Sequence, residues 1–110
     1  MSKRVFRVVW SEAASGDLNG IVAFIADDSP AAARRVHARI KARAGGLKAF
    51  AERGRVVPEL AYIDVRTFRE LVDEPYRLVY RIEGARVIVM AVFDGRRDLQ
   101  QLLLERLVRT

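Results

Sequence analysis

Two arginines on one predicted strand are the first residues whose type and spacing suggest chemistry. In Tyr76–Glu83 alternate residues point to opposite faces of the strand, so Arg77 and Arg81 share a face. Guanidinium groups bind phosphates and carboxylates through paired N–H donors, so this face is predicted to be an exposed cationic surface for such a partner. The alternative is a solvated face whose arginines pair with nearby carboxylates, namely Glu70, Asp73 and Glu83.

A second cationic site is predicted at the turn after the last strand. The segment Asp94–Asp98 contains a tight Asp-Gly turn followed by Arg96 and Arg97. Side chains on such a turn are accessible, so these two arginines join Arg77 and Arg81 as the residues expected to contact a target. A basic turn is also an ordinary solvated feature, and that interpretation stays open.

No residues with the spacing of a catalytic or metal site accompany these arginines. The chain has no Cys and a single His, so it lacks a thiolate nucleophile and the ligand set of a zinc centre. That residue, His37, falls beside the apolar stripe of a predicted helix and has no recognisable nucleophile or orienting partner. Gly45-Gly46 lacks the Lys-Ser/Thr of a phosphate-binding loop. We expect no cofactor and no metal, and we assign no catalytic residue.

The composition is that of one small globular domain spanning residues 1–110. With 20 Lys and Arg against 14 Asp and Glu, the formal net charge is +6, and 51% of the residues are hydrophobic. The apolar runs are far shorter than the ~20 residues that span a bilayer, and the N-terminus is not a signal sequence, so we expect a cytoplasmic protein without a membrane partner. Seventeen of the cations are Arg, which indicates either an acidic or nucleic-acid partner or the codon bias of a GC-rich genome.

The elements that must position these residues begin with a strand and two helices. Val5–Trp10 is rich in β-branched and aromatic residues, which predicts a strand. Ser11 is a good N-cap, and the apolar spacing after it predicts a helix that ends near Asp27 and Asp28. Ser29 and Pro30 then start a second helix, and so short a link requires an antiparallel helical hairpin.

The second helix is predicted to bury a stripe that includes Val36 and Ile40. Gly45-Gly46 is expected to end or bend it, and Leu47 and Phe50 favour its resumption. The sequence GRVVPEL that begins at Gly54 is predicted to be a loop.

Three strands and a helix complete the predicted domain. The segments Val65–Val72, Tyr76–Glu83 and Arg86–Phe93 alternate and are joined by tight connectors, so they predict a three-stranded antiparallel meander. Asp98 is expected to cap a closing helix with an apolar face of Leu99, Leu102, Leu103 and Leu107. The fold class is α+β, with the helices on one side of the sheet.

In this order the motifs resemble those of the ParE/RelE superfamily of toxins from bacterial type II toxin–antitoxin modules. The similarity extends from about Val5 to Leu99 and implies the RelE/ParE-like fold. The matching pieces are Ala13-Ala14, Asp17-Leu18 and Ile21; Ser29-Pro30 and Ala33; Gly54-Arg55 with Val57-Pro58-Glu59-Leu60; Arg69-Glu70-Leu71; Tyr76-Arg77-Leu78-Val79-Tyr80-Arg81; and Asp94-Gly95-Arg96-Arg97-Asp98.

The resemblance implies one of two activities. RelE-like members are ribosome-dependent endoribonucleases that cut mRNA, and they need proton donors and acceptors beside the phosphate. Here Asp94 stands where the wider superfamily often has His, and neither Tyr nor His follows Tyr80, although Glu59 or Glu70 could stand in. ParE-like members poison DNA gyrase by binding, which requires no catalytic residue. The hairpin, the VPEL segment and the RELV segment are closer to ParE, so gyrase inhibition is favoured and mRNA cleavage is the alternative.

A toxin of this kind is expected to be neutralised by an acidic antitoxin, in a toxin–antitoxin hetero-oligomer whose stoichiometry the sequence leaves open. A partner strand can extend the sheet, and a partner helix can pack against the hairpin. We expect contacts at Val36, Ile40, Leu103 and Leu107. The alternative for the leucines is that they complete the core. A third class of function is a basic module that binds nucleic acid with no toxic target.

Overall fold

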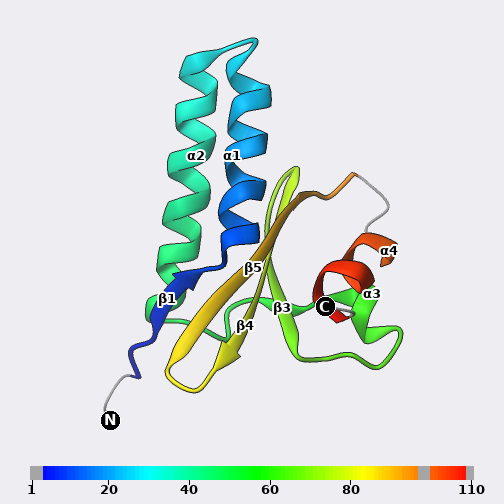
Figure 1. Cartoon of the computed structure of the whole chain (residues 1–110). Coiled ribbons are helices and arrows are strands. Elements are labelled where there is room, and N and C mark those ends of the chain that lie inside the picture. The colour runs from blue at the N-terminus through cyan, green and yellow to red at the C-terminus, as the bar shows by residue number, and fades with distance from the viewer. Residues whose placement is uncertain (1–3, 97–99, 109–110) are drawn as a thin grey trace.

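The computed structural model describes residues 4–96 and 100–108 and has the predicted α+β fold (Figure 1). A five-stranded sheet has the order β1-β5-β4-β3-β2. Its strands are β1 (Arg7–Trp10), β2 (Arg55–Val56), β3 (Phe68–Asp73), β4 (Tyr76–Glu83) and β5 (Arg86–Asp94). The helices are α1 (Glu12–Ala26), α2 (Pro30–Gly45), the 3₁₀ turn η1 (Gly46–Lys48), α3 (Pro58–Ala61), α4 (Gln100–Leu103) and the π-helical turn η2 (Leu104–Val108).

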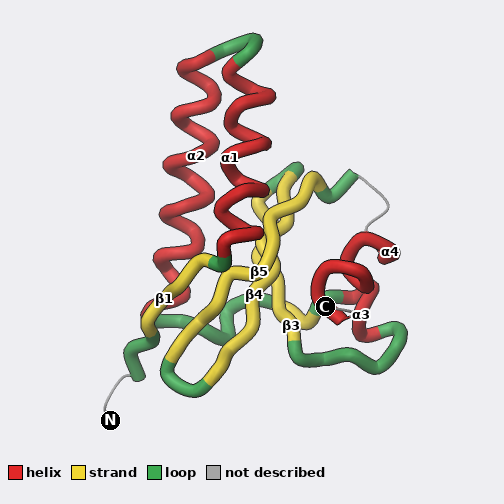
Figure 2. Tube along the Cα trace, in the orientation of Figure 1, coloured by secondary structure: helices red, strands yellow, loops and turns green. Residues whose placement is uncertain are grey.

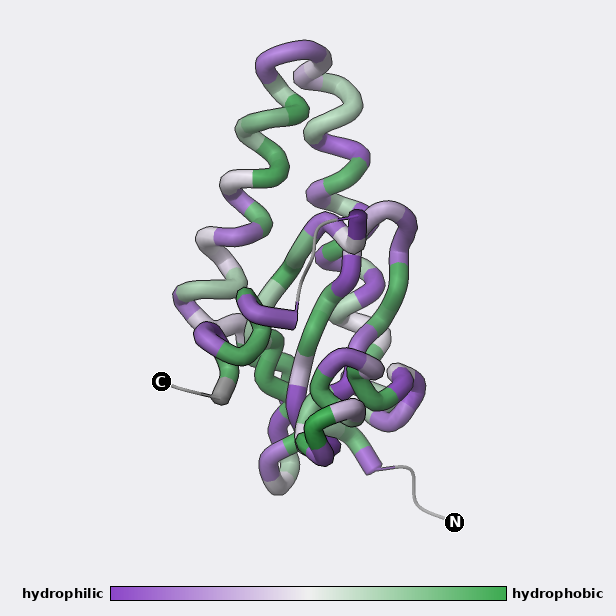
Figure 3. Tube along the Cα trace, turned by 90° about the vertical axis from the view of Figure 1, so that its right-hand side faces the viewer, coloured by the Kyte–Doolittle hydropathy of each residue, from purple (hydrophilic) through white to green (hydrophobic). Residues whose placement is uncertain are grey.

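The helical hairpin has the predicted caps. The Ser11 hydroxyl accepts the Ala14 amide at 3.0 Å at the start of α1. The Ser29 hydroxyl accepts the Ala32 amide at 3.1 Å, and Pro30 occupies the first turn of α2, where its missing N–H costs nothing. Hydrophilic and hydrophobic residues alternate along both helices, as expected for an amphipathic pair (Figure 3).

The predicted meander is confirmed, and β1 extends it. Strands β3, β4 and β5 pair antiparallel, and β1 pairs parallel with β5, with Val8 opposite Val87. Val79 pairs with Ala91 but Tyr80 pairs with Val89, so Met90 is an extra residue in β5. This bulge changes which residues of β5 face the hairpin.

The prediction that all helices lie on one side of the sheet is wrong. The hairpin covers one face, where Leu18, Ile40 and Leu47 pack against strand residues such as Leu78 and Tyr80. On the other face Leu60 of α3 and Leu103 of α4 pack in a second core, with Phe68, Val79, Ala91 and Phe93. Figures 1 and 2 show the hairpin and the α3–α4 pair on opposite sides of the strands. Because helices cover both faces of the sheet, the central strands bury apolar side chains that point to either face.

Several predicted boundaries also differ from the structure. Helix α2 ends at Gly45 and continues only as the single turn η1, which leaves Phe50 53% exposed outside any helix. The expected loop that begins at Gly54 contains β2 and α3, and β3 begins at Phe68 rather than Val65. The predicted cap Asp98 and the apolar residue Leu99 lie outside the described residues.

Candidate functional site

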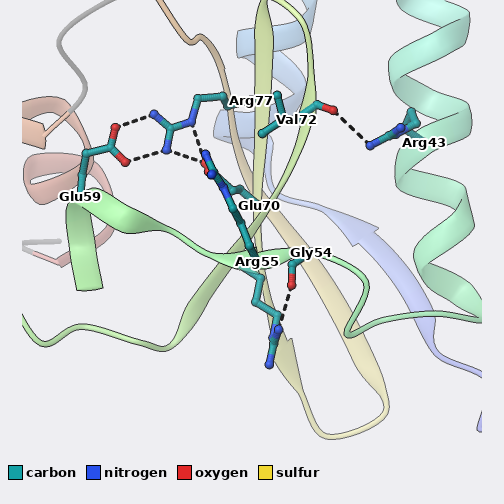
Figure 4. A network of polar contacts seen from close by, with 8 residues as sticks. Arg43, Gly54, Arg55, Glu59, Glu70, Val72 and Arg77 are labelled. Atoms are coloured by element: carbon teal, nitrogen blue, oxygen red, sulfur yellow. Dashed lines mark hydrogen bonds and ion pairs between the residues drawn. The ribbon is translucent and has the colours of Figure 1, made fainter. Parts of the chain in front are cut away.

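A buried charged cluster joins α3 to the sheet. Arg77 of β4 and Glu70 of β3 are 9% and 1% exposed, and the Arg77 Nε donates to Glu70 Oε1 at 2.7 Å. The Arg77 Nη1 and Nη2 atoms donate to the two carboxylate oxygens of Glu59, at 2.5 and 2.6 Å. Arg55 of β2 donates to the second Glu70 oxygen at 2.7 Å. Figure 4 shows these side chains converging between α3 and the strands.

Local sequence explains why these residues meet. Register places Arg55 opposite Glu70 and Glu70 opposite Val79, so residues of this parity share the face covered by α3 and α4. Pro58 and Glu59 begin α3 at the edge of that face, and Glu59 reaches over it to Arg77. The prediction that Arg77 lies on an exposed cationic face is therefore wrong, because helices cover that face. Arg81, two residues further along β4, has a 37% exposed side chain.

The electrostatics of the cluster follow from this geometry. The hydrogen bonds from Arg77 hold the pKa of Glu59 below its ordinary value, against the opposing effect of burial. The same bonds with Glu59, and the charge of Glu70, raise the pKa of Arg77, so it stays cationic at any physiological pH. The paired donors of Arg77 are engaged by carboxylates of its own chain.

The depressed pKa of Glu59 predicts a pH-dependent stability. A carboxylate with a lowered folded-state pKa stabilises the protein above its unfolded-state pKa, and the contribution disappears as the pH falls through the folded-state value. We expect Glu59→Gln to be less stable than the parent at pH 7, with the difference shrinking as the pH falls below about 4.3, the ordinary value for Glu. Urea unfolding of both proteins from pH 7 to pH 3 measures the difference. A difference independent of pH would contradict this assignment.

The four arginines predicted to contact a target have different surroundings. Arg77 and Arg96 line a common pocket of about 200 Å³ with Arg55. Arg96 has a 74% exposed side chain and pairs with Asp94, whereas Arg81 pairs with Glu83 and does not line this pocket. Arg97 lies outside the described residues. The structure therefore brings together two of the four.

A buried tyrosine fixes the segment that precedes β2, and sequence analysis missed it. Tyr80 is fully buried, its hydroxyl donates to the Ala51 carbonyl at 2.7 Å, and it accepts the Gly54 amide at 2.9 Å. Burial raises the pKa of the Tyr80 hydroxyl. Its position on the apolar parity of β4 was predictable, but its partners come from a segment whose path the sequence did not define.

Removing this hydroxyl tests its structural role. We expect Tyr80→Phe to destabilise the fold by roughly 1–3 kcal/mol, because the Gly54 amide and the Ala51 carbonyl would lose a buried partner. The measurement is the free energy of unfolding in urea. Tyr62→Phe is the matched control, since Tyr62 is 86% exposed and its substitution should leave the free energy of unfolding unchanged. Equal stability of Tyr80→Phe and the parent would contradict the assignment.

A surface depression separate from the charged cluster lies between α1, the start of β4, the end of β5, and α4. This groove has a volume of about 530 Å³. Gly16 and Gly20 of α1 form part of it, and no atom lies within 4 Å of the place that a Cβ would take on either residue. Phe24, which is 80% exposed, and Leu102 also line it. The groove is thus accessible and mainly apolar, although the charged residues Asp17, Asp94, Arg96 and Arg106 also line it.

The residues predicted to bind an antitoxin are mostly in the cores. Ile40 is 2% exposed and Leu103 is fully buried, whereas Val36 and Leu107 are partly buried and pack at the margins of the two cores. Leu103 therefore completes a core in this structure. The accessible groove is lined by neighbours of the predicted leucines, Leu102 and Arg106.

The described part of the chain contains no cluster of His, Asp and Glu that could hold a metal ion, and no described helix is long and apolar enough to cross a membrane. His37 lies exposed on α2, remote in sequence from the cluster around Arg77. Among the hydrogen-bonded side chains of residues 4–96 and 100–108, we find no nucleophile with an adjacent base.

Comparison with known proteins gives concordant matches. The model of a family described as the ParE toxin of the type II toxin–antitoxin system parDE matches residues 8–99. Toxin RelE2 of Caulobacter vibrioides is 34% identical over 92 residues, which cover 83% of this chain and 97% of that protein.

Two solved structures share the fold. A structure from the chromosomal ParDE toxin–antitoxin system of P. aeruginosa has a TM-score of 0.67 at 20% identity, and covers 83% of this chain and 97% of its own. The toxin–antitoxin complex RelBE2 from Mycobacterium tuberculosis has a TM-score of 0.57 at 20% identity, with coverages of 82% and 91%.

Proposed function

Because the chain belongs to the ParE toxin family of type II toxin–antitoxin systems, we propose that it acts by binding and that its target is DNA gyrase. The observation that carries this proposal is that the hydrogen-bond donors of Arg77 are engaged by carboxylates of the same chain. Its guanidinium donates to Glu59 and Glu70, so the charge that would stabilise a cleaving phosphate is already neutralised inside the protein. A toxin that acts by binding does not need that charge.

The other candidate acid–base groups are also engaged. Glu59 and Glu70, which could serve as proton acceptors, are ion-paired with arginines. The Tyr80 hydroxyl is buried and hydrogen-bonded on both sides. A general acid or base must reach the proton that it transfers, and these groups lie where a substrate would have to displace native contacts. This arrangement supports inhibition by binding.

Target contact is proposed to involve Arg81, Arg96 and the neighbouring Arg97. Among the described residues, Arg81 and Arg96 form ion pairs with carboxylates near the surface, Glu83 and Asp94. Exposed ion pairs contribute about 0–1 kcal/mol, so a target can replace them at little cost. Arg77 is proposed to support this surface indirectly, because it lines the same pocket as Arg96 and is itself fixed by Glu59 and Glu70.

A gyrase supercoiling assay tests the proposal. We expect the purified protein to inhibit supercoiling, and we expect its antitoxin to reverse this inhibition. The double variant Arg81→Gln with Arg96→Gln should raise the inhibitory concentration by at least tenfold. The matched control is Arg53→Gln with Arg66→Gln, which removes two exposed cations elsewhere. Unchanged supercoiling at stoichiometric excess of the parent protein would overturn the proposal.

The alternative is ribosome-dependent mRNA cleavage, which the name of the relative RelE2 and the RelBE2 neighbour favour. For this activity Arg77 or Arg81 would have to contact the phosphate. Programmed ribosomes with a defined codon in the A site distinguish the two functions, because only a ribonuclease would cut the mRNA. Arg81→Ala should then weaken cleavage.

An acidic antitoxin is the proposed partner, and we place part of its binding surface at the groove beside α1, with Val36, Ile40, Leu103 and Leu107 shaping the underlying cores. Glycines at positions 16 and 20 let a partner helix approach the α1 backbone closely. The solved neighbours come from toxin–antitoxin systems, which supports a hetero-oligomer. We propose that the protein encounters both gyrase and this antitoxin in the cytoplasm.

Filling the groove tests its role in binding the antitoxin. We expect Gly20→Leu to weaken antitoxin binding by at least tenfold without loss of stability, because Leu has the higher helix propensity and its Cβ would meet no neighbouring side chain. The control is Ala23→Leu, which adds the same side chain on α1 at a residue that does not line the groove. Isothermal titration with the cognate antitoxin gives both affinities. Equal affinity of the two variants would contradict the placement.

A further inference from the structure

The positive charge of the protein is concentrated in two segments. Residues 1–11 and 30–51 hold nine of the 20 cations and none of the 14 acids. The remaining sequence holds 11 cations and 14 acids, so it is net negative. The charge of +6 therefore belongs to β1 with the residues before it, and to α2 with the residues that follow it.

These two segments lie side by side in the fold. The Lys41 ammonium of α2 lies 4.5 Å from the centre of the Trp10 ring in β1, and the Phe6 amide donates to the Lys48 carbonyl at 2.8 Å. Figure 1 shows β1 beside the end of α2 nearest the sheet. We call the exposed cations of this combined surface the α2 cationic face; its members are Arg4, Arg7, Arg34, Arg35, Arg39, Lys41 and Lys48.

Few carboxylates neutralise the α2 cationic face. Arg39 pairs with Asp73 at 2.9 Å, but within the described residues no ion pair engages Arg34 or Arg35. Arg43, at the margin, donates to the Val72 carbonyl, which does not reduce its charge. Sixteen residues of α2 extend about 24 Å, so the free charges are spread along a rigid rod.

We propose that the α2 cationic face binds the phosphate backbone of duplex DNA without sequence preference. The face is charged and lacks large exposed hydrophobic residues on α2, whereas a protein interface usually needs apolar or aromatic anchors. Single-stranded nucleic acid would be held by a row of exposed aromatic rings, but α2 contains no Phe, Trp or Tyr, and Lys41 lies over the Trp10 ring. The exposed Phe50 lies beyond η1, at the end of the charged segment. The rigid, closely spaced phosphates of duplex DNA match the charge and the spacing of the α2 cationic face.

This proposal is independent of gyrase as the target, because it concerns DNA bound by the toxin alone. The surface is separate from Arg81 and Arg96, which are proposed to contact the protein target. If both proposals hold, the toxin contacts gyrase and the bound DNA through two different surfaces. Failure of one leaves the other standing.

The test is fluorescence anisotropy with the full chain and a labelled 20-base-pair duplex between 50 and 200 mM KCl. With four phosphate contacts the affinity should fall roughly 150-fold over this range, since the logarithmic slope is about −0.9 per contact. Arg34→Gln with Arg35→Gln should make the slope shallower by about 1.8. The control Arg53→Gln with Arg66→Gln changes the net charge equally and should keep the parent slope.

Three outcomes would overturn the proposal. Equal weakening by the two double variants would assign binding to net charge rather than to the α2 cationic face. Equal or tighter binding of the single strand of the same length would contradict duplex recognition. Displacement of the duplex by poly-glutamate at equal charge concentration would identify the face as a site for an acidic protein. Circular dichroism of each variant confirms that the fold is kept, because Arg34 and Arg35 are exposed.

Discussion

Replacing Arg77 with Met is expected to lower the free energy of unfolding by about 3–5 kcal/mol, the usual cost of removing one partner from a buried ion pair. Among the described residues, Glu70, which is 1% exposed, would keep Arg55 as its one ionic partner, and Glu59 would lose both of its bonds to Arg77. The buried Glu70 carboxylate, which would then be paired only with the exposed Arg55, dominates this cost more than the lost attraction does. Urea unfolding at pH 7 measures it.

Two variants separate this explanation from a general loss of packing. Arg55→Gln also removes a partner of Glu70, but the Arg55 side chain is 60% exposed and the loss should stay below about 1 kcal/mol. The double variant Arg77→Met with Glu70→Leu removes both buried charges and should be less destabilised than the two single variants together. A cost of Arg77→Met no larger than that of Arg55→Gln would show that the cluster does not stabilise the fold.

Gly54→Ala is the second change with a large expected effect. A Cβ at this residue would lie 2.6 Å from the Glu70 carbonyl oxygen and 2.6 Å from the Tyr80 hydroxyl. Neither atom can move freely, because one is backbone in β3 and the other belongs to a fully buried side chain. We expect a loss of roughly 1–3 kcal/mol, the range for forced overpacking, and a clear fall in the thermal midpoint.

Gly16→Ala is the matched control for this prediction. Position 16 lies within α1 and has no atom within 4 Å of the added Cβ, so the substitution should stabilise the protein by up to about 1 kcal/mol through helix propensity. Calorimetry of both variants gives opposite signs if close approach is the reason for Gly54. Destabilisation by Gly16→Ala and tolerance of Gly54→Ala would reverse the assignment.

The hairpin and the meander could be predicted because their signals are local. Ser11 and Ser29 mark helix starts through hydrogen bonds within one turn, Pro30 favours the first turn of α2 through its fixed backbone angle, and the alternation of β4 fixes its two faces. The placement of α3 could not be predicted in this way. A four-residue helix has almost no periodicity, and α3 is held by Glu59 reaching Arg77 and Leu60 entering the second core.

The candidate site was predicted in part for the same reason. Parity correctly placed Arg77 on the face opposite Tyr80, but only tertiary structure determines whether that face is covered. The pairing of Arg77 with Glu70, which the sequence offered as the alternative to a binding surface, is present. Arg81 and Arg96 stay accessible because they lie near strand and turn ends beyond the covering helices.

Trapping of cleavage complexes, in which gyrase stays covalently attached to broken DNA, is the most direct measure of the central claim that this toxin acts by binding to gyrase. One protein preparation would be incubated in parallel with gyrase and supercoiled plasmid, and with ribosomes programmed with mRNA. We predict linear DNA covalently bound to gyrase, released on addition of the antitoxin, and intact mRNA. Codon-dependent mRNA cleavage with no gyrase-bound DNA breaks would contradict the claim.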